Sequence, residues 1–229
     1  MGNERSRRRA AYAPRLIIMA KGPRAGRVKQ RLARSIGVTA ATSFARTCFA
    51  HTLLRLGGSP RWRTLLAIAP DADVAAALWF QAVWPRRIAR LPQGDGDLGR
   101  RMQRLFQRLP PGPVIIVGSD IPAIGAPEIA CAFRLLGNAD AVLGRAPDGG
   151  YWLVGLRRSP RLLAPFARVR WSSPNALADT LGNLEKRRVA FAATLSDVDS
   201  EDAYRRLRGH WQRLIPPRSG KKPGLAPRV

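Results

Sequence analysis

The chain has 229 residues, of which 45% are hydrophobic, so a folded core is expected and disorder along the whole chain is excluded. Forty Lys and Arg against fifteen Asp and Glu give a net charge of +25, which would attract any polyanion, from nucleotides to RNA and anionic lipid. The two cysteines lack the spacing of a zinc site or a disulfide framework, and no apolar segment is long enough for a signal peptide or membrane span. Both observations favour a cytoplasmic protein.

The two ends of the chain differ in composition from its middle. Residues 1–13 are an Arg-rich lead without periodicity, and residues 213–229 form a basic tail rich in Pro and Gly. We expect both ends to be disordered, because neither can bury enough apolar surface to offset the entropy of ordering. Residues 14–212 then form a single domain.

Within residues 14–212, short apolar runs alternate with amphipathic stretches. The runs predict strands at residues 15–20, 62–69, 87–91, 113–117, 139–144, 151–156 and 189–192. The stretches predict helices at residues 28–36, 39–56, 71–83, 98–109, 126–136, 174–184 and 201–208, with Asp71 as the N-cap of the third. This alternation is typical of an α/β domain with a mainly parallel central sheet.

The strand predicted at residues 113–117 has the clearest functional context. Four consecutive β-branched residues, from Val114 to Val117, predict a strand buried on both faces, and Gly118 and Ser119 end it directly before Asp120. In open α/β sheets, ligands bind outside the carboxyl ends of the strands. Asp120 is therefore expected at the functional site.

Acidic residues are scarce in this chain, and their distribution is uneven. Seven of the fifteen fall in four loops that carry Gly or Pro: Asp95, Asp97, Asp120, Asp148, Asp197, Asp199 and Asp202. Any one of them could simply form a turn or cap a helix. Three of the four loops follow predicted strands, however, and a divalent cation on a diphosphate prefers carboxylate oxygens. We predict that Asp120 and Asp199 bind Mg²⁺ or Mn²⁺.

A glycine-containing basic loop lies between the first predicted strand and the first predicted helix. Its five cations surround Gly22 and Gly26, and they are Lys21, Arg24, Arg27, Lys29 and Arg31. Glycines let the backbone approach a phosphate closely, and a helix start offers free N–H groups. The spacing is neither that of a P-loop nor that of a Rossmann fingerprint. The loop predicts phosphate binding, with a solvated basic face as the alternative.

Other catalytic arrangements find little support in the sequence. Neither His51 nor His210 neighbours a nucleophile motif, which argues against a Ser-His-Asp site. Trp152 and Trp171 could stack on a base or a sugar, but packing in the core is the expected role of each.

Five motifs in this order resemble a known bacterial family. They are residues 20–32, 96–102, 118–122, 148–151 and 197–202, which read AKGPRAGRVKQRL, GDLGRRM, GSDIP, DGGY and DVDSED. The family is a glycosyltransferase-like group of the nucleotide-diphospho-sugar transferase (GT-A-like) superfamily, and the resemblance runs from about residue 16 to residue 207. It implies a single α/β/α sandwich.

The resemblance also implies roles for individual residues. The 20–32 loop would bind the nucleotide base and phosphates through Lys21, Gly22, Gly26, Lys29 and Arg31. Asp120 and Asp199 would hold the metal, and Asp120, Asp148 and Lys29 would take part in catalysis. Residues 96–99, with Asp97 at the nucleotide, would close over the ligand, while Gly149, Gly150 and Tyr151 would line the sugar or acceptor side. The chain departs from the family at Gln30, where Thr is usual, and at Arg145, where Pro is usual.

Three functions follow as hypotheses. The first is a metal-dependent glycosyltransferase that uses a nucleoside-diphosphate sugar and an unknown acceptor, with Lys29 and Arg31 assisting departure of the diphosphate. The second is a nucleotidyltransferase that couples a nucleoside triphosphate to a phosphorylated or carboxylated substrate. The third, less favoured because no common nucleic-acid-binding signature occurs, is a nucleic-acid-binding protein without catalysis.

Overall fold

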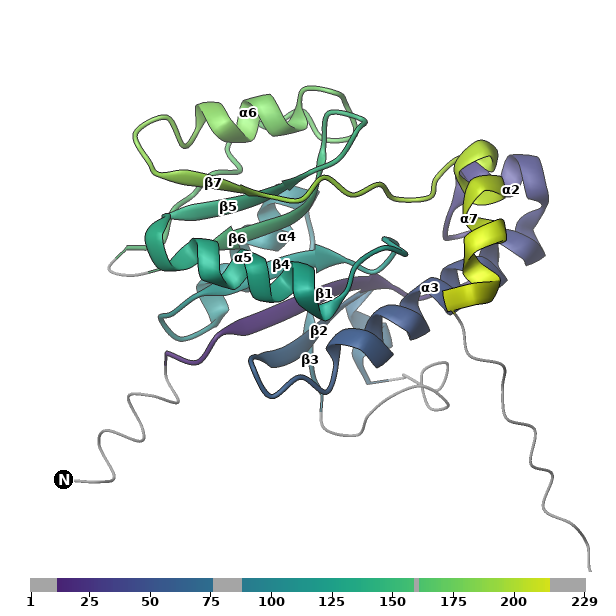
Figure 1. The fold of residues 1–229 in the computed structure, drawn as a ribbon, viewed down its shortest axis with the longest axis horizontal. Coiled ribbons are helices and arrows are strands. Elements are labelled where there is room, and N and C mark those ends of the chain that lie inside the picture. The colour runs from purple at the N-terminus through teal and green to yellow at the C-terminus, as the bar shows by residue number, and fades with distance from the viewer. Residues whose placement is uncertain (1–11, 76–87, 159–160, 215–229) are drawn as a thin grey trace, which may run out of the picture.

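The computed structural model describes residues 12–75, 88–158 and 161–214, which form one α/β domain around a seven-stranded sheet (Figure 1). Its strands are β1 Arg15–Lys21, β2 Arg63–Ala69, β3 Ala89–Pro92, β4 Val114–Gly118, β5 Ala141–Arg145, β6 Tyr151–Leu156 and β7 Val189–Ala192. They lie in the order β3-β2-β1-β4-β6-β5-β7, and β6 alone runs antiparallel to its neighbours. The predicted mainly parallel sheet is confirmed.

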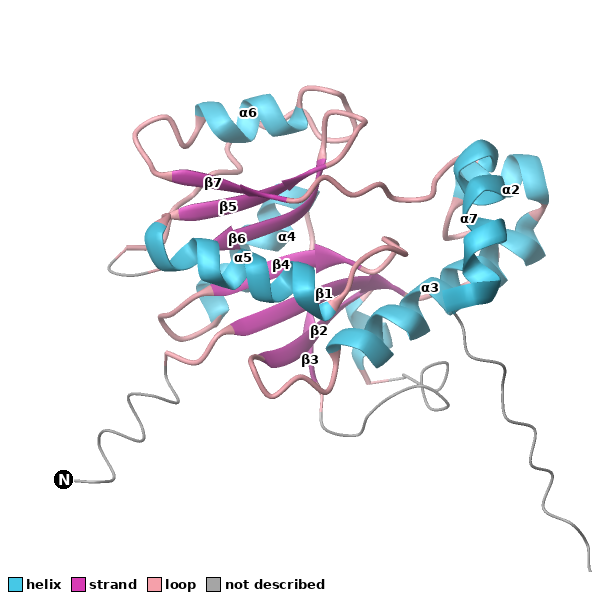
Figure 2. Ribbon diagram, viewed as in Figure 1, coloured by secondary structure: helices cyan, strands magenta, loops and turns pink. Residues whose placement is uncertain are grey.

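Helices cover both faces of the sheet (Figure 2). They are α2 Gln30–Ile36, α3 Val38–Leu56, α4 Leu98–Arg108, α5 Ala126–Asn138, α6 Ala176–Gly182 and α7 Glu201–Leu214, with a 3₁₀ helix, η1, at Asp71–Val74. Among the described residues, none of these helices combines the length and the apolar character needed to cross a membrane.

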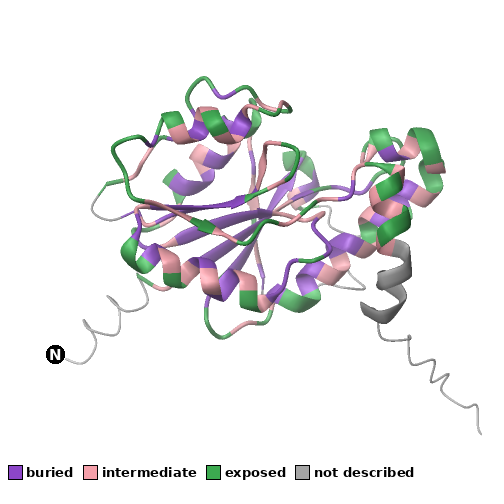
Figure 3. Cartoon of the chain, turned by 45° about the horizontal axis from the view of Figure 1, so that its top comes forward, coloured by how far each residue is buried: buried purple, intermediate pink, exposed green. Residues whose placement is uncertain are grey.

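The side chains of the central strands alternate between two cores. Leu16 and Ile18 of β1 pack on the side of α3 and α5, whereas Ile17 packs on the side of α4 and α6. In β4, Ile115 and Val117 face the first core, and Val114 and Ile116 face the second. These four residues of β4 are buried, as predicted. Figure 3 shows the sheet enclosed between helices. The predicted sandwich is confirmed.

A third, smaller core lies beside the sheet, where α2 and α7 pack on the N-terminal half of α3 (Figure 1). It consists of Leu32, Ala41, Phe44, Cys48 and Val198, with Tyr204 and Leu207 packed against it. The ring of Phe44 meets that of Tyr204 edge-on, with 5.1 Å between centroids. This packing fixes the two segments that flank the site described below, residues 22–29 and 193–200.

Most predicted boundaries agree with the structure within two or three residues, but the helix predicted at residues 71–83 is wrong in its described part. Only η1 forms there, and residues 76–87 lie outside the described ranges, as does part of the strand predicted at 87–91. Asp71 is not an N-cap, because Pro70 holds that position. The Asp71 carboxylate instead accepts a hydrogen bond of 2.9 Å from the backbone N–H of Gly94.

The β5–β6 turn depends on a glycine. Gly149 has a φ of 83°, in the left-handed region, and a Cβ at this position would overlap the backbone of Pro174. The N–H of Leu177 donates to the carbonyl of Gly149 at 3.1 Å, which ties the turn to the start of α6.

Removing the edge-on aromatic pair should loosen α7 from α3. We expect Phe44→Ala to lower the free energy of unfolding by about 3 kcal/mol, because it leaves a cavity where α7 packs. Leu54→Ala on the same helix, at a side chain that is 70% exposed, should change it by less than about 0.5 kcal/mol. Urea unfolding measures both variants, and amide hydrogen exchange should be accelerated in α7 by Phe44→Ala alone. Equal effects of the two changes would contradict the packing role.

The turn glycine gives a second prediction. Gly149→Ala should lower the free energy of unfolding by about 2 kcal/mol, since it combines a strained φ with a backbone overlap. Gly137→Ala, on α5 with open space around its Cβ position, should be neutral or stabilising by up to about 1 kcal/mol. Thermal unfolding distinguishes them, and a Gly149→Ala variant as stable as the parent would show that the turn tolerates a side chain.

Candidate functional site

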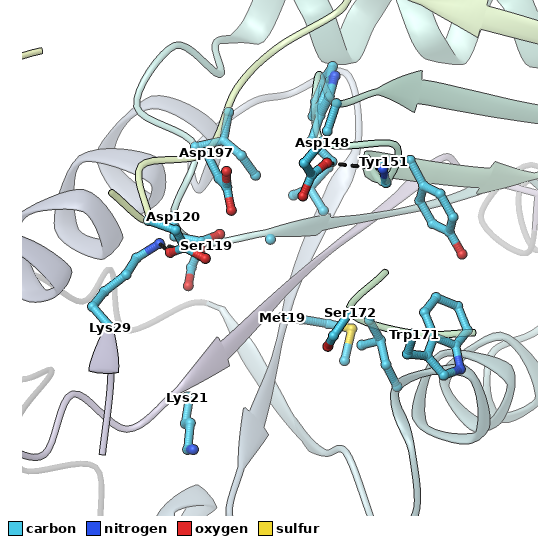
Figure 4. A pocket seen from close by; sticks show the side chains of 18 of the residues that line it. Met19, Lys21, Lys29, Ser119, Asp120, Asp148, Tyr151, Trp171, Ser172 and Asp197 are labelled. Atoms are coloured by element: carbon cyan, nitrogen blue, oxygen red, sulfur yellow. Dashed lines mark hydrogen bonds and ion pairs between the residues drawn. The ribbon is translucent and has the colours of Figure 1, made fainter. Parts of the chain in front are cut away.

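A cavity of about 920 Å³ opens at the carboxyl ends of β1 and β4. Because β6 runs antiparallel to β4, its first residue, Tyr151, lies at this same edge of the sheet. The cavity wall therefore combines the loop after β1, the loop after β4, the β5–β6 turn and the segment between β7 and α7 (Figure 4). This is the edge at which the sequence places Asp120.

Three carboxylates from distant parts of the chain meet on one wall of the cavity. Asp120 follows β4, and Asp197 and Asp199 precede α7. One oxygen from each lies within 4.8 Å of the other two. Between the two later acids, Val198 is buried in the small helical core, so it anchors the segment that carries them. Hard oxygen donors at this spacing can hold a divalent cation.

Lys29 fills the space between two of these acids. Its Nζ donates to Asp120 Oδ2 at 2.8 Å and also to Asp199 Oδ1. The side chain is only 6% exposed, although Asp120 and Asp199 are 41% and 45% exposed. Burial lowers the pKa of Lys29, but the charges and hydrogen bonds of the two carboxylates outweigh it and raise the pKa overall. Lys29 is therefore a charged ammonium held within the acid cluster, which consists of Asp120, Asp197 and Asp199.

The third acid has a different electrostatic environment. Burial, followed by the charge of Asp199, raises the pKa of Asp197 to about 6, although the Lys29 ammonium partly opposes the rise. Asp120 and Asp148 add further negative charge. The four carboxylates thus repel one another, and an added cation would be attracted to them.

The basic loop contributes most of its predicted residues to the cavity. Lys21, Arg27, Lys29 and Arg31 line the wall. Gly22 and Gly26 shape the loop and do not line it: the N–H of Gly22 donates to the carbonyl of Ala69 at 3.0 Å, and Gly26 has a φ of 72°. The loop thus carries four cations on the wall beside the acids.

One cation of the loop turns away from the cavity. Arg24 pairs with Asp73, which is 1% exposed and lies in η1. The other oxygen of Asp73, Oδ2, has no hydrogen-bond partner among the described residues. Arg24 therefore attaches the loop to η1 and does not line the cavity.

Asp97 has a structural role at the start of α4. Its side chain accepts a hydrogen bond of 2.8 Å from the N–H of Arg100, so it is the N-cap of α4 and lies away from the described cavity wall. The loop before it is fixed from α4, because Arg104 donates to the carbonyls of Gln93 at 2.7 Å and Asp95 at 2.9 Å. The sequence allowed each loop acid to be a helix cap instead of a ligand, and Asp97 has this cap role.

The β5–β6 turn forms the opposite wall. Asp148, Gly150 and Tyr151 line the cavity, and Gly149 supports the turn from behind. The Asp148 carboxylate accepts a 3.0 Å hydrogen bond from the N–H of Gly150 and is otherwise exposed. The Tyr151 hydroxyl lies 3.3 Å from Thr180 Oγ1, and burial raises the pKa of Tyr151. Figure 4 shows this hydroxyl directed away from the acids.

The predicted metal pair, Asp120 and Asp199, does not include Asp197, and the predicted place of Trp171 is the core. The signal for Asp197 was its spacing, since acids two residues apart can share a side of the chain when the residue between them is buried. Trp171 packs against the second core, as predicted, and it also lines the cavity, where it meets Tyr151 edge-on at 6.2 Å between centroids. No sequence signal marks this second role; a Cβ at Gly99 would lie 2.7 Å from the Trp171 ring, a contact that only the fold reveals. Trp152 is in the core as predicted, and its Nε1 donates to the carbonyl of Ala193 at 2.9 Å.

Many solved structures share this fold, and three of them illustrate the range of similarity. A proposed nucleotide-diphospho-sugar transferase from Desulfovibrio desulfuricans aligns with a TM-score of 0.75 and 24% identity, covering 89% of this chain and 97% of that chain. The 4-diphosphocytidyl-2C-methyl-D-erythritol synthase from Anaerococcus prevotii aligns with a TM-score of 0.58 and 12% identity over 89% and 98% of the two chains. A CMP:2-keto-3-deoxy-manno-octonic acid synthetase in complex with CTP gives 0.55 and 12% over 88% and 99%.

At these identities the similarity establishes the fold, which is that of nucleotide-diphospho-sugar transferases. No match to a curated protein was found. The family model described as "Uncharacterized protein conserved in bacteria (DUF2064)" matches residues 52–173, more than half of the chain, and the protein belongs to that family.

Proposed function

We propose that the protein is a metal-dependent glycosyltransferase that takes a nucleoside-diphosphate sugar as donor. The observation that carries the proposal is the meeting of Asp120, Asp197 and Asp199 with a basic loop on one cavity at the carboxyl edge of the sheet. A volume of about 920 Å³ is sufficient for a ligand of this size. Nucleotides of this kind are intracellular substrates, so we place the activity in the cytoplasm.

The donor set suits Mg²⁺ or Mn²⁺. The acid cluster offers carboxylate oxygens alone, without sulfur or imidazole, which is the choice of hard divalent cations. Asp120 and Asp199 would hold the ion, with Asp197 as a third ligand. When bound, the ion neutralises negative charge on a diphosphate leaving group.

The protein's own residues supply the remaining functions. Lys21, Arg27, Lys29 and Arg31 line the cavity and would bind the phosphates. Asp148 is the exposed carboxylate on the opposite wall, and none of the ion pairs among the described residues includes it. It can therefore accept the proton of an acceptor hydroxyl. Gly150, Tyr151 and Trp171 would contact the sugar or the acceptor on that side, where aromatic faces suit the apolar face of a sugar ring.

A nucleotidyltransferase is the second candidate. Four cations on the cavity wall match the higher charge of a nucleoside triphosphate. The same fold also occurs in a synthetase crystallised with CTP. In this case the basic loop would bind the triphosphate, and a phosphorylated or carboxylated substrate would attack the α-phosphate.

A nucleotide screen separates the two candidates. We expect UDP-, GDP-, ADP- or CDP-sugars to raise the melting temperature in the presence of Mg²⁺ or Mn²⁺, by about 5–10 °C at a hundredfold excess over Kd. Free triphosphates should have a smaller effect. The reverse order would favour nucleotidyl transfer, and a set of nucleotides that leaves the melting temperature unchanged would contradict both candidates.

Substitution of the acids tests the metal site directly. Asp120→Asn and Asp199→Asn should each weaken Mn²⁺ binding by more than the roughly 10–100-fold typical of residues that only support a ligand. Asp202→Asn is the matched control, because Asp202 is exposed in the first turn of α7 and outside the acid cluster. Calorimetric titration with Mn²⁺ measures all three. The metal assignment fails if the control and the two cluster variants behave alike.

A further inference from the structure

In this structure, the cation between Asp120 and Asp199 is the ammonium group of Lys29. Its Nζ donates to both carboxylates, with 2.8 Å to Asp120 Oδ2, and the side chain is 6% exposed. Asp120 and Asp199 are two of the three acids that the proposed function assigns to a divalent ion. A divalent ion held by the same two carboxylates would lie close to the Lys29 ammonium, and like charges at such short range repel each other.

The backbone at Lys29 shows that this position is held under constraint. Lys29 has φ 48° and ψ 45°, a left-handed conformation that is uncommon for a residue with a Cβ. It directly precedes α2, at the end of the loop that supplies Lys21 and Arg27 to the cavity. A flexible four-carbon side chain at this point can leave the carboxylates and still remain within the cavity.

We propose that a divalent metal displaces the Lys29 ammonium from Asp120 and Asp199, and that the released Lys29 then binds the diphosphate of the donor. Lys29 is thus a stand-in cation that keeps the two carboxylates together until the metal arrives. Metal binding and phosphate binding are then coupled. The metal ion replaces the ammonium as the partner of each carboxylate, and phosphate oxygens replace the carboxylates as the partners of Lys29. The inference rests on the proposed function for the identity of the phosphate ligand.

The exchange predicts effects of opposite sign from one substitution. Lys29→Met should tighten the binding of Mn²⁺ alone by about tenfold or more, because the competing ammonium is gone. It should weaken the binding of inorganic pyrophosphate in saturating Mn²⁺ by about tenfold or more, because a charge-assisted phosphate contact is lost. Calorimetric titration with each probe measures the two affinities.

Lys21→Met is the matched control. It removes the same charge from the same cavity wall, and Figure 4 shows Lys21 well apart from the acids that Lys29 contacts. Its affinity for Mn²⁺ alone should change by less than about threefold, the size of a screened long-range charge effect. If both variants bound Mn²⁺ more tightly by the same factor, the effect would be one of total charge, and the exchange would be wrong. Weaker Mn²⁺ binding by Lys29→Met would also overturn it.

Amine labelling of the unmodified protein is a second measurement, and it does not depend on a variant that folds. Acetic anhydride followed by mass spectrometry should find Lys29 protected without metal, labelled when Mn²⁺ alone is added, and protected again with pyrophosphate. Lys186, which is exposed, is the internal reference. If Mn²⁺ binds and the labelling of Lys29 does not rise, the exchange is wrong while the metal site stands. If Mn²⁺ binds neither the parent nor Lys29→Met, the metal site itself is wrong.

Discussion

The contact of Lys29 with Asp120 and Asp199 joins three segments that are far apart in the sequence. Asp120 follows Lys29 by 91 residues, and Asp199 follows it by 170 residues. Removing a charge of this kind from water is costly unless it is paired and hydrogen-bonded, so a buried ammonium requires both acids in place. The loop after β1, the end of β4 and the entry to α7 therefore meet at one point.

The architecture explains how such distant segments are brought together. β1 and β4 are adjacent and parallel, so Lys21 and Gly118 end at the same edge of the sheet. The reversal of β6 adds the Asp148 turn to that edge, because the strand begins where its neighbours end. The small core around Leu32 and Phe44 holds α2 and α7 together. The two helices thus set the position of Lys29 and of Asp199 relative to each other.

Much of this arrangement was predictable from sequence, and the failures have physical reasons. The β-branched run before Gly118 defines a buried strand by local composition alone, and a carboxylate at its end is then placed by topology. The cap role of Asp97 could not be assigned from the sequence, because a cap and a ligand-binding acid look alike in a Gly-rich loop and the hydrogen bond from the Arg100 N–H is visible only in the fold. The ion pair of Lys29 could not be foreseen, since it depends on the distance between segments that the sequence does not order in space.

The excess of positive charge is in part structural, and this limits what it says about ligands. Several arginines donate to backbone carbonyls that lack partners in regular structure: Arg55 to Ile124 at 3.2 Å, Arg104 to Gln93, and Arg158 to Pro110 at 2.6 Å. Such side chains hold loops against neighbouring elements, α3 for Arg55 and α4 for Arg104, and they satisfy carbonyl groups that regular structure leaves unpaired. A nucleic-acid-binding role would need cations gathered on an open surface. Within the part of the chain that the structure describes, the cations of the basic loop instead line a cavity beside four carboxylates, and the negative charge of these carboxylates opposes the approach of a long polyanion.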